Sequence, residues 1–231
     1  PSSSRERVTS ANFSFAPDDR LDGKISIGDN ARRNQLYVVQ GGLGSLDDQE
    51  KTGSNIDGEI NFTPRPTIEL GFRAGASKSA FLSKVREDLA SSGNGSSWEA
   101  TLKTTVWGAT IDNKLSARKD RLEPAVSDTT ESETSSLEGR LNRRLNHKLV
   151  AKLDWLVRAD RLYYQTFEPA DRFDRDELKT KIQPSVTYTP TLTWTITTTY
   201  IRSVSRRVEV NPSRANQTRR EEDYTIDFNI S

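Results

Sequence analysis

Residues 137–159, LEGRLNRRLNHKLVAKLDWLVRA, decide the fold of this chain. Nearly every odd position from Leu137 to Ala159 carries an apolar residue or glycine, whereas most even positions carry charged or polar residues. Successive residues of a β-strand point to opposite faces, so the alternation predicts two strands with one apolar and one charged face. A turn is expected at Asn146 and His147, which makes the segment a hairpin.

The same alternation recurs along the chain and predicts twelve antiparallel strands. They are expected at 8–16, 20–30, 35–44, 58–64, 67–75, 96–108, 111–122, 135–146, 148–164, 177–189, 192–204 and 223–231. Tight turns are expected at 31–34, 63–66, 109–113, 146–147 and 189–191, and long polar loops at 45–57, 76–95, 122–134, 165–176 and 205–222. The connection at 17–19 is the one short connection expected among the long loops.

Short turns at one end and long polar loops at the other are typical of outer-membrane β-barrels. The sequence therefore predicts an all-β fold: a closed, antiparallel, up-and-down transmembrane β-barrel of about 12 strands, built from residues 1–231 as a single domain. The even count places both termini at the turn end. The segment 35–44 alternates poorly, and without it the count is odd, the end strands run parallel, and the chain is the C-terminal part of a larger barrel.

The composition fits this class and excludes others. The chain has 231 residues, 32% of them hydrophobic and 29% charged, with a net charge of +1. The mean hydropathy of −0.75 is low, but a barrel needs apolar residues only at alternate strand positions. No apolar run reaches the ~18 residues of a spanning helix. The sequence contains no cysteine, which suits an oxidising periplasm, and the small net charge predicts no nucleic-acid partner.

The end of the sequence resembles a known family. Leu178 to Tyr188, Thr189 to Thr191, Leu192 to Val204 and Asp223 to Ile230 form the pattern of closing barrel strands. The chain resembles the outer-membrane β-barrel porin superfamily, and 177–231 looks like the final strands of porins associated with exopolysaccharide export. The resemblance implies a bacterial outer-membrane location and recognition of the last strand by the barrel-assembly machinery, although that strand usually closes on an aromatic residue and here ends at Ser231.

The polar strand positions are expected to line the lumen. The basic ones are Lys103, Lys114, Arg118, Arg140, Arg144, Lys152, Arg158, Lys179 and Lys181. A confined basic excess would favour anions. Two interpretations stay open: a narrow anion-selective conduit, or cross-strand salt bridges with the nearby carboxylates that simply fill the interior.

The last predicted loop is strongly basic through Arg206, Arg207, Arg219 and Arg220. These arginines could bind lipopolysaccharide phosphates or an acidic glycan, and the alternative is that Glu209, Glu221 and Glu222 neutralise them. A short amphipathic helix is expected within 78–90.

Catalysis and metal binding have little support in the residues. The one histidine, His147, lies in a predicted turn away from any serine nucleophile, so no catalytic residue and no enzyme activity are expected. No cofactor or metal site is expected, because Asp47, Asp48 and Glu50 lack the spacing of a calcium loop.

The leading hypothesis is an outer-membrane barrel that acts as a passive pore or export conduit for anionic solutes or acidic saccharides. The alternative is a non-conducting structural or adhesive barrel within a larger envelope assembly. Expected partners are outer-membrane lipid, lipopolysaccharide, the barrel-assembly machinery, and envelope or export proteins. A soluble β-sandwich is the third hypothesis, and the placement of long loops at one end argues against it.

Overall fold

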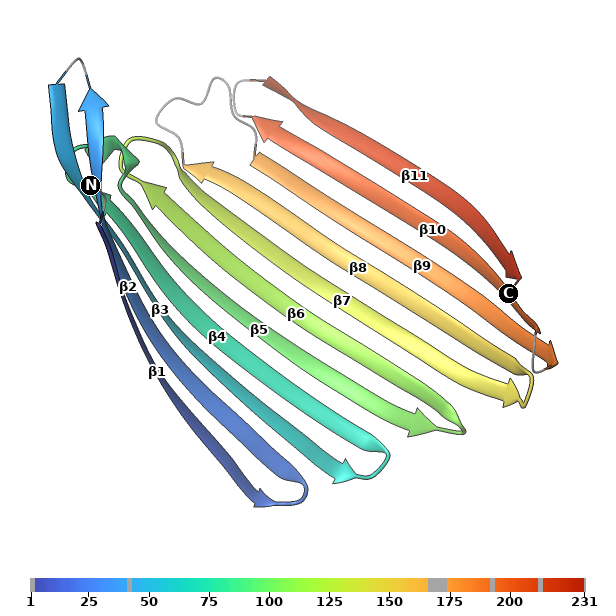
Figure 1. The fold of residues 1–231 in the computed structure, drawn as a ribbon. Coiled ribbons are helices and arrows are strands. Elements are labelled where there is room, and N and C mark those ends of the chain that lie inside the picture. Colours follow the sequence, from blue (N-terminus) through green and yellow to red (C-terminus); the bar gives the residue numbers. More distant parts are fainter. Residues whose placement is uncertain (1–2, 41–42, 166–173, 192–193, 212–213, 231) are drawn as a thin grey trace.

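The protein is described by a computed structural model that covers residues 3–40, 43–165, 174–191, 194–211 and 214–230. The described residues form one antiparallel sheet of eleven strands, each paired with its sequence neighbours in an up-and-down meander (Figure 1). The strands are β1 (Ser3–Asp18), β2 (Leu21–Gln40), β3 (Leu43–Arg65), β4 (Ile68–Ser83), β5 (Ser91–Val106), β6 (Ala109–Pro124), β7 (Thr129–Asn146), β8 (Leu149–Gln165), β9 (Asp174–Thr191), β10 (Trp194–Asn211) and β11 (Arg214–Ile230). A 3₁₀ turn, η1 (Glu87–Leu89), follows β4.

The two ends of the sheet differ. Two-residue turns at 19–20, 66–67, 107–108 and 147–148 lie at one end, here called the turn end, where β11 also finishes. The opposite end, called the loop end, carries the connections 84–90 and 125–128 and the start of β1. The sequence placed the short connection at 17–19 at the same end as the long loops. This connection is instead a two-residue turn at 19–20 and lies at the turn end.

The strands are longer than the sequence predicted. Residues 45–57 lie inside β3, and most of 205–222 lies in β10 and β11, so these predictions of loops were wrong. Residues 31–34 continue β2 instead of turning, and 35–44 is not a separate strand. Strands pair through backbone hydrogen bonds, which do not require apolar side chains at alternate positions. A segment that is polar on both faces can therefore continue a strand, although its sequence is also compatible with a loop.

Three smaller predictions also need correction. The turn expected at 109–113 lies at 107–108, and 109–113 begins β6. The helix expected within 78–90 is absent from the described residues, since 78–83 ends β4 and only Glu87–Leu89 is helical. Residues 189–191, expected to turn, end β9, and the connection at 192–193 lies outside the described residues, as does most of the loop expected at 165–176.

The sheet is open. Among the described strands, β1 pairs only with β2 and β11 only with β10, and both run from the loop end to the turn end. An antiparallel ladder cannot close between two strands that run in the same direction. The expected closed barrel of twelve strands is thus corrected to an open sheet of eleven, the odd count expected if 35–44 is not a strand.

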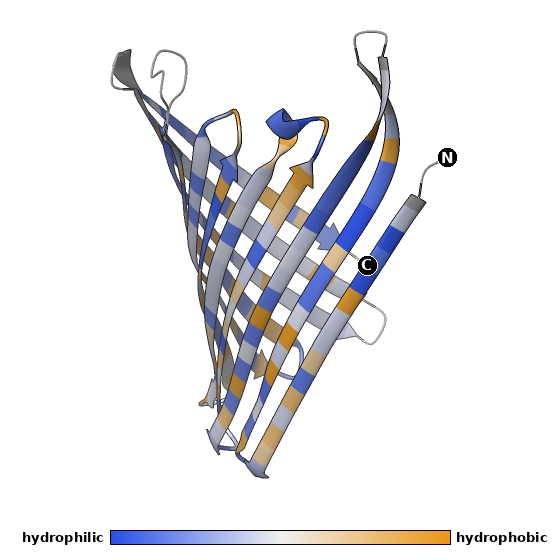
Figure 2. Ribbon diagram, turned by 90° about the vertical axis from the view of Figure 1, so that its left-hand side faces the viewer, coloured by the Kyte–Doolittle hydropathy of each residue, from blue (hydrophilic) through white to orange (hydrophobic). Residues whose placement is uncertain are grey.

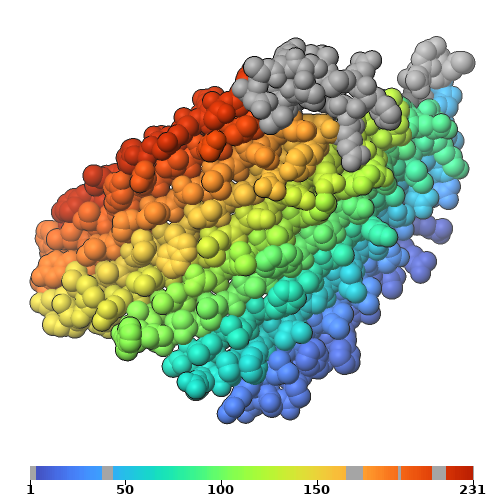
Figure 3. Space-filling model, turned by 180° about the vertical axis from the view of Figure 1, so that it is seen from behind, coloured from blue at the N-terminus to red at the C-terminus, as the bar shows by residue number. Residues whose placement is uncertain are grey.

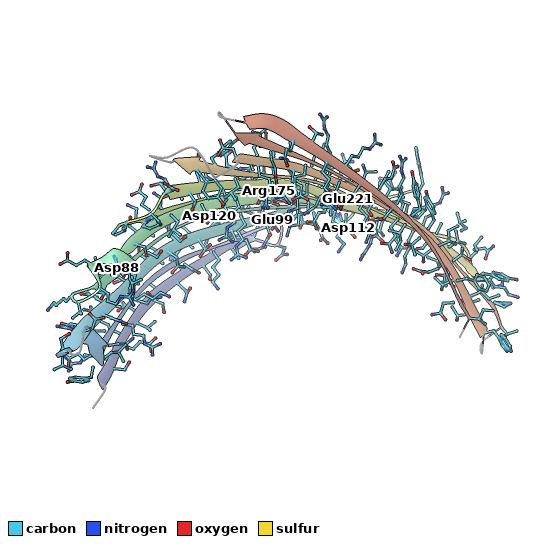
Figure 4. The ribbon with its side chains drawn as sticks, turned by 90° about the horizontal axis from the view of Figure 1, so that it is seen from above. Asp88, Glu99, Asp112, Asp120, Arg175 and Glu221 are labelled. Atoms are coloured by element: carbon cyan, nitrogen blue, oxygen red, sulfur yellow. The ribbon has the colours of Figure 1, made fainter. Side chains whose placement is uncertain are left out.

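One face of the sheet is charged and hollow. Glu69, Lys103, Asp112, Arg140 and Asp154 are successive cross-strand partners from β4 to β8, so their side chains share a face. Residues of this face from β3 to β9 line a hollow of about 800 Å³. Seen from above, the sheet bends into an arch with Glu99 and Asp112 along its inner side (Figure 4). We call this the concave face and the opposite one the convex face.

The convex face carries an apolar band next to the turn end. On β8 the convex positions are apolar from Leu149 to Ala159 and then change to Arg161; on β4 they are apolar from Ile68 to Ala76 and then change to Lys78. Figure 2 shows the same change along the strands. Ten residues rise roughly 33 Å along a strand. In a strand tilted by the ~45° usual for membrane barrels, this gives a height close to their ~25 Å apolar band.

The sheet has no core of its own. Among the described residues, Ala109 is the one buried hydrophobic side chain, whereas Phe13, Ile226 and Phe228 are 64%, 73% and 64% exposed. Seen from behind, the side chains of the eleven strands form one continuous surface (Figure 3). An apolar sheet face must be covered, and a sandwich would need a second sheet that the described residues do not contain.

No helix in the described part of the chain is long and apolar enough to cross a membrane.

Candidate functional site: the concave face

The nine basic residues predicted to line a lumen share the concave face. The register pairs Lys103 with Asp112, Arg118 with Ser97 and Arg140 with Asp154, and it carries this face across β9 to Lys179 and Lys181. The remaining members, Lys114, Arg144, Lys152 and Arg158, lie at the same alternate positions of β6, β7 and β8. The register thus places all nine on one face, and that this face lines a lumen stays a prediction.

Six of these nine residues are ion-paired. Across strands, Lys103 Nζ lies 3.4 Å from Glu69, Lys114 Nζ 2.7 Å from Glu99 and Arg140 Nε 2.5 Å from Asp154. Along single strands, Arg118 pairs with Asp120 at 2.6 Å, Arg158 with Asp160 at 2.9 Å and Lys179 with Glu177 at 3.2 Å. The carboxylates therefore offset most of the positive charge, as the salt-bridge interpretation of the sequence expected.

The other three basic residues differ from one another. Arg144 donates to the main-chain oxygens of Asn146 at 3.2 Å and His147 at 3.1 Å, so its guanidinium ties the β7–β8 turn. No ion pair joins Lys152 or Lys181 to a described residue, and Lys181 lines the hollow. Lys181 is thus a cation of the concave face whose charge stays available to a solute.

The hollow is also lined by a carboxylate with an oxygen that has no donor among the described residues. Asp112 lies in register between Lys103 and Arg140 and lines the hollow. Its Oδ1 is buried and accepts no hydrogen bond from a described residue. A buried acceptor without a donor is costly, so Asp112 favours an incoming group that can donate. The hollow is therefore lined by a cation without an ion pair to a described residue and by a buried carboxylate oxygen without a donor among these residues.

The four arginines of the predicted loop lie in strands instead. Arg207 and Arg219 are on the concave face and pair with Glu209 and, at 2.6 Å, with Glu221. Arg206 and Arg220 are on the convex face, where Arg220 pairs with Glu222 at 3.3 Å. Glutamates two positions along the same strand pair with three of the four, and Arg206 forms no ion pair with a described residue.

A buried carboxylate, which the sequence analysis considered only as a calcium ligand, holds the β4–η1 connection at the loop end. Asp47 is 0% exposed. Its carboxylate accepts hydrogen bonds from Ser83 Oγ, from Gln49 Nε2 at 2.8 Å and from the backbone N–H of Val85 at 3.0 Å. Burial alone would raise the pKa of Asp47, but these donors together lower it below its usual value.

The next residue faces the convex side and is held by charge. Asp48 pairs with Arg33 and, at 3.0 Å, with Lys84 Nζ. Hydrogen bonds from Arg33 and Lys84 lower the pKa of Asp48 far below its usual 3.8. Because Asp47 and Asp48 point to opposite faces and are both occupied by donors, they do not form a calcium site with Glu50. Among the described residues, no group of three candidate ligands is placed to hold a metal ion.

Solved structures of outer-membrane receptors share this fold. The FrpB iron transporter from Neisseria meningitidis matches 99% of this chain with a TM-score of 0.72 and 12% identity. The copper transporter OprC matches 98% at 0.60 and 12%, and the alcaligin outer-membrane receptor FauA from Bordetella pertussis matches 99% at 0.61 and 11%. The sheet has the fold of an outer-membrane receptor wall. This chain spans only 42%, 42% and 50% of those three chains.

The likeness confirms the all-β architecture and the bacterial outer membrane as the compartment of this fold. The similar structures are transporters and receptors rather than enzymes, in line with the expectation of no catalysis. None of the three is a porin, so the resemblance of 177–231 to exopolysaccharide-export porins stays a prediction. No protein-family model and no curated protein sequence matches the chain.

Proposed function

We propose that this sheet forms part of the wall of an outer-membrane transport barrel, with the convex band in lipid and the concave face lining the passage. The proposal rests above all on one observation: the sheet matches, over nearly its whole length, the structures of iron, copper and siderophore transporters and receptors. Further strands beyond β1 and β11 would close the barrel. Without such strands, the unpaired backbone edges of β1 and β11 would be open to non-native pairing.

The transported solute is proposed to be a charged metal complex that contacts the hollow. Lys181 supplies a cation without an ion pair to a described residue, and Asp112 Oδ1 supplies an acceptor. The ladder of salt bridges around them keeps the wall close to neutral and fixes the long side chains. A wall of this kind suits a solute with both donor and acceptor groups better than a simple anion.

Cysteine labelling tests the orientation of the wall, because the chain has no cysteine of its own. Arg140→Cys and its neighbour Leu141→Cys would be made in the full-length protein in outer-membrane vesicles. We expect a water-soluble maleimide to modify the Arg140→Cys variant and to leave the Leu141→Cys variant unmodified. Equal modification of both in the folded protein would contradict a lipid-facing convex band.

Transport itself is tested by uptake. Cells that lack their own siderophore receptors would express the full-length protein and be offered a panel of radiolabelled ferric siderophores. We expect uptake of at least one, reduced several-fold by Lys181→Gln and little changed by Lys179→Gln, since Lys179 is already paired. Absence of uptake across the panel, with the protein shown to be inserted, would contradict a siderophore as the solute.

A passive, anion-selective pore is the second candidate. The observation in its favour is that Lys152 and Lys181 form no ion pair with a described residue, which leaves positive charge on the concave face. Planar-bilayer conductance of the full-length protein separates the two candidates. Stable steps with anion preference would favour the pore. Silence from inserted protein would favour a closed transporter, since 22-stranded outer-membrane transporters carry a plugged lumen.

A further inference from the structure

Two like charges face each other on the convex side of β10 and β11. Arg206 is the cross-strand partner of Arg220, and both side chains are exposed. Like charges directly opposite each other destabilise an antiparallel pair. Electrostatic repulsion therefore destabilises the sheet at the point where the apolar band ends. An anion bound between the two guanidinium groups would remove this repulsion.

The carboxylate nearest to these arginines is already occupied. Glu222 accepts from Arg202 Nη2 at 2.6 Å and from Arg220 Nη2 at 3.3 Å, and the hydroxyl of Tyr224 also donates to it. No ion pair joins Arg206 to a described residue. Two arginines therefore share one glutamate, whereas the third, Arg206, has no ion pair with a described residue. The group Arg202, Arg206, Arg220 and Glu222 is called the arginine cluster.

The convex face is not basic everywhere at this height. On β6 and β7, Lys119 lies between Glu131 and Glu133 and pairs with both, so acid outnumbers base there. Lys119 stands just above the apolar band of β6, as Arg206 does on β10. The surplus of positive charge on β10 and β11 is therefore absent from β6 and β7.

Apolar and aromatic side chains lie directly below the cluster. Tyr224, Ile226 and Phe228 follow it on the convex face of β11, and each is more than half exposed at 58%, 73% and 64%. The guanidinium carbon of Arg202 lies 5.7 Å from the ring centre of Tyr224. Charge above an exposed apolar strip is what a lipid with an anionic headgroup requires, and aromatic residues favour this interfacial depth.

We propose that the arginine cluster binds a phosphate group of lipopolysaccharide in the outer leaflet, with an acyl chain of the lipid along Tyr224, Ile226 and Phe228. The loop end faces outward in membrane barrels of this kind, which places the cluster at that leaflet. A phosphate monoester carries about −1.5 to −2 charges, which suits three arginines against one glutamate better than a singly charged phospholipid diester does. Arginine binds phosphate oxygens through paired N–H groups.

The test compares lipids on the purified full-length protein. Binding of lipopolysaccharide, of the same glycolipid after phosphatase treatment and of phosphatidylglycerol would be titrated against wild type and the double variant Arg206→Ala/Arg220→Ala. Lys119→Ala on β6 is the matched control, at a similar height on the convex face. We expect the double variant and the dephosphorylated glycolipid each to lose at least tenfold in affinity, the control to bind like wild type, and phosphatidylglycerol and inorganic phosphate to bind far more weakly.

Equal affinity for phosphatidylglycerol, or an unchanged affinity of the folded double variant, would overturn the proposal. If the double variant does not fold, Arg206→Gln carries the same test, because Arg206 forms no ion pair with a described residue. The inference rests on the proposed place of the sheet in the outer membrane. Heat-dependent electrophoretic mobility and vesicle flotation show whether the wild-type protein inserts into a membrane. Failure to insert refutes the proposed function. Inserted wild-type protein without a preference for lipopolysaccharide refutes this inference alone.

Discussion

Ser83 Oγ lies 2.9 Å from each carboxylate oxygen of Asp47, and this contact ties the end of β4 to the first residues of β3. The same serine oxygen accepts the backbone N–H of Arg86 at 2.9 Å. Asp47 also accepts the N–H of Val85. One buried carboxylate and one hydroxyl therefore accept the backbone N–H groups of Val85 and Arg86, at the start of the connection 84–90.

Loss of the Asp47 carboxylate is expected to open this connection locally. In Asp47→Ala the N–H of Val85 and the hydroxyl of Ser83 lose their acceptor, and unpaired buried groups cost about 1–3 kcal/mol each. We expect amide hydrogen exchange of 84–90 to accelerate at least tenfold, with exchange of β7 and β8 unchanged. Ser96→Ala, an exposed serine of β5, is the control. Unchanged exchange in Asp47→Ala would contradict the role given to this carboxylate.

Acid should release the same connection at an unusually low pH. The pKa of Asp48 is lowered by Arg33 and Lys84, so the folded state favours the ionised carboxylate. The stabilisation is complete above the usual pKa of 3.8 and is lost as the pH falls through the lower folded-state pKa. We expect protection of Lys84 and its neighbours to persist at pH 4 and to fall near pH 2. Asp48→Asn should lose this part of the pH dependence, and an unaltered profile in that variant would assign the transition to other groups.

The sequence predicted the faces of the sheet better than the lengths of its strands. Alternation located Arg140 and Asp154 on one face and Leu153 and Trp155 on the other, because within the band only the convex face is apolar. Above the band both faces are wet, so residues such as Lys119 and Glu133 form a strand without leaving an alternating pattern. The Asp47–Ser83 contact joins residues 36 apart, and no local pattern records it.

The turn between β5 and β6 carries an aromatic residue in a costly conformation. Trp107 has φ 50° and Gly108 has φ 72°, as in a type I′ hairpin turn, which favours asparagine followed by glycine. Trp107 is 90% exposed. Trp107→Asn should therefore stabilise the folded protein in detergent by about 1 kcal/mol, since asparagine tolerates positive φ better. Denaturant unfolding measures the change, with Trp98→Phe as the control; a destabilised Trp107→Asn variant would show that the indole makes contacts worth more than the strain.

Lipid contact of the convex face is expected to appear in tryptophan fluorescence. Trp155 is the convex partner of Gly139, and a Cβ at that glycine would overlap the indole ring, so the ring lies flat over the neighbouring strand. Leu156, the next residue, is the cross-strand partner of Glu138 and Lys181 on the concave face. In a background with Trp98, Trp107 and Trp194 replaced by phenylalanine, brominated lipid should quench Trp155 strongly. The double variant Trp155→Leu/Leu156→Trp moves the indole by one residue and therefore to the other face of the sheet. In this variant, quenching by lipid should fall several-fold and quenching by aqueous iodide should rise. Equal lipid quenching at both positions would refute the assignment of the two faces.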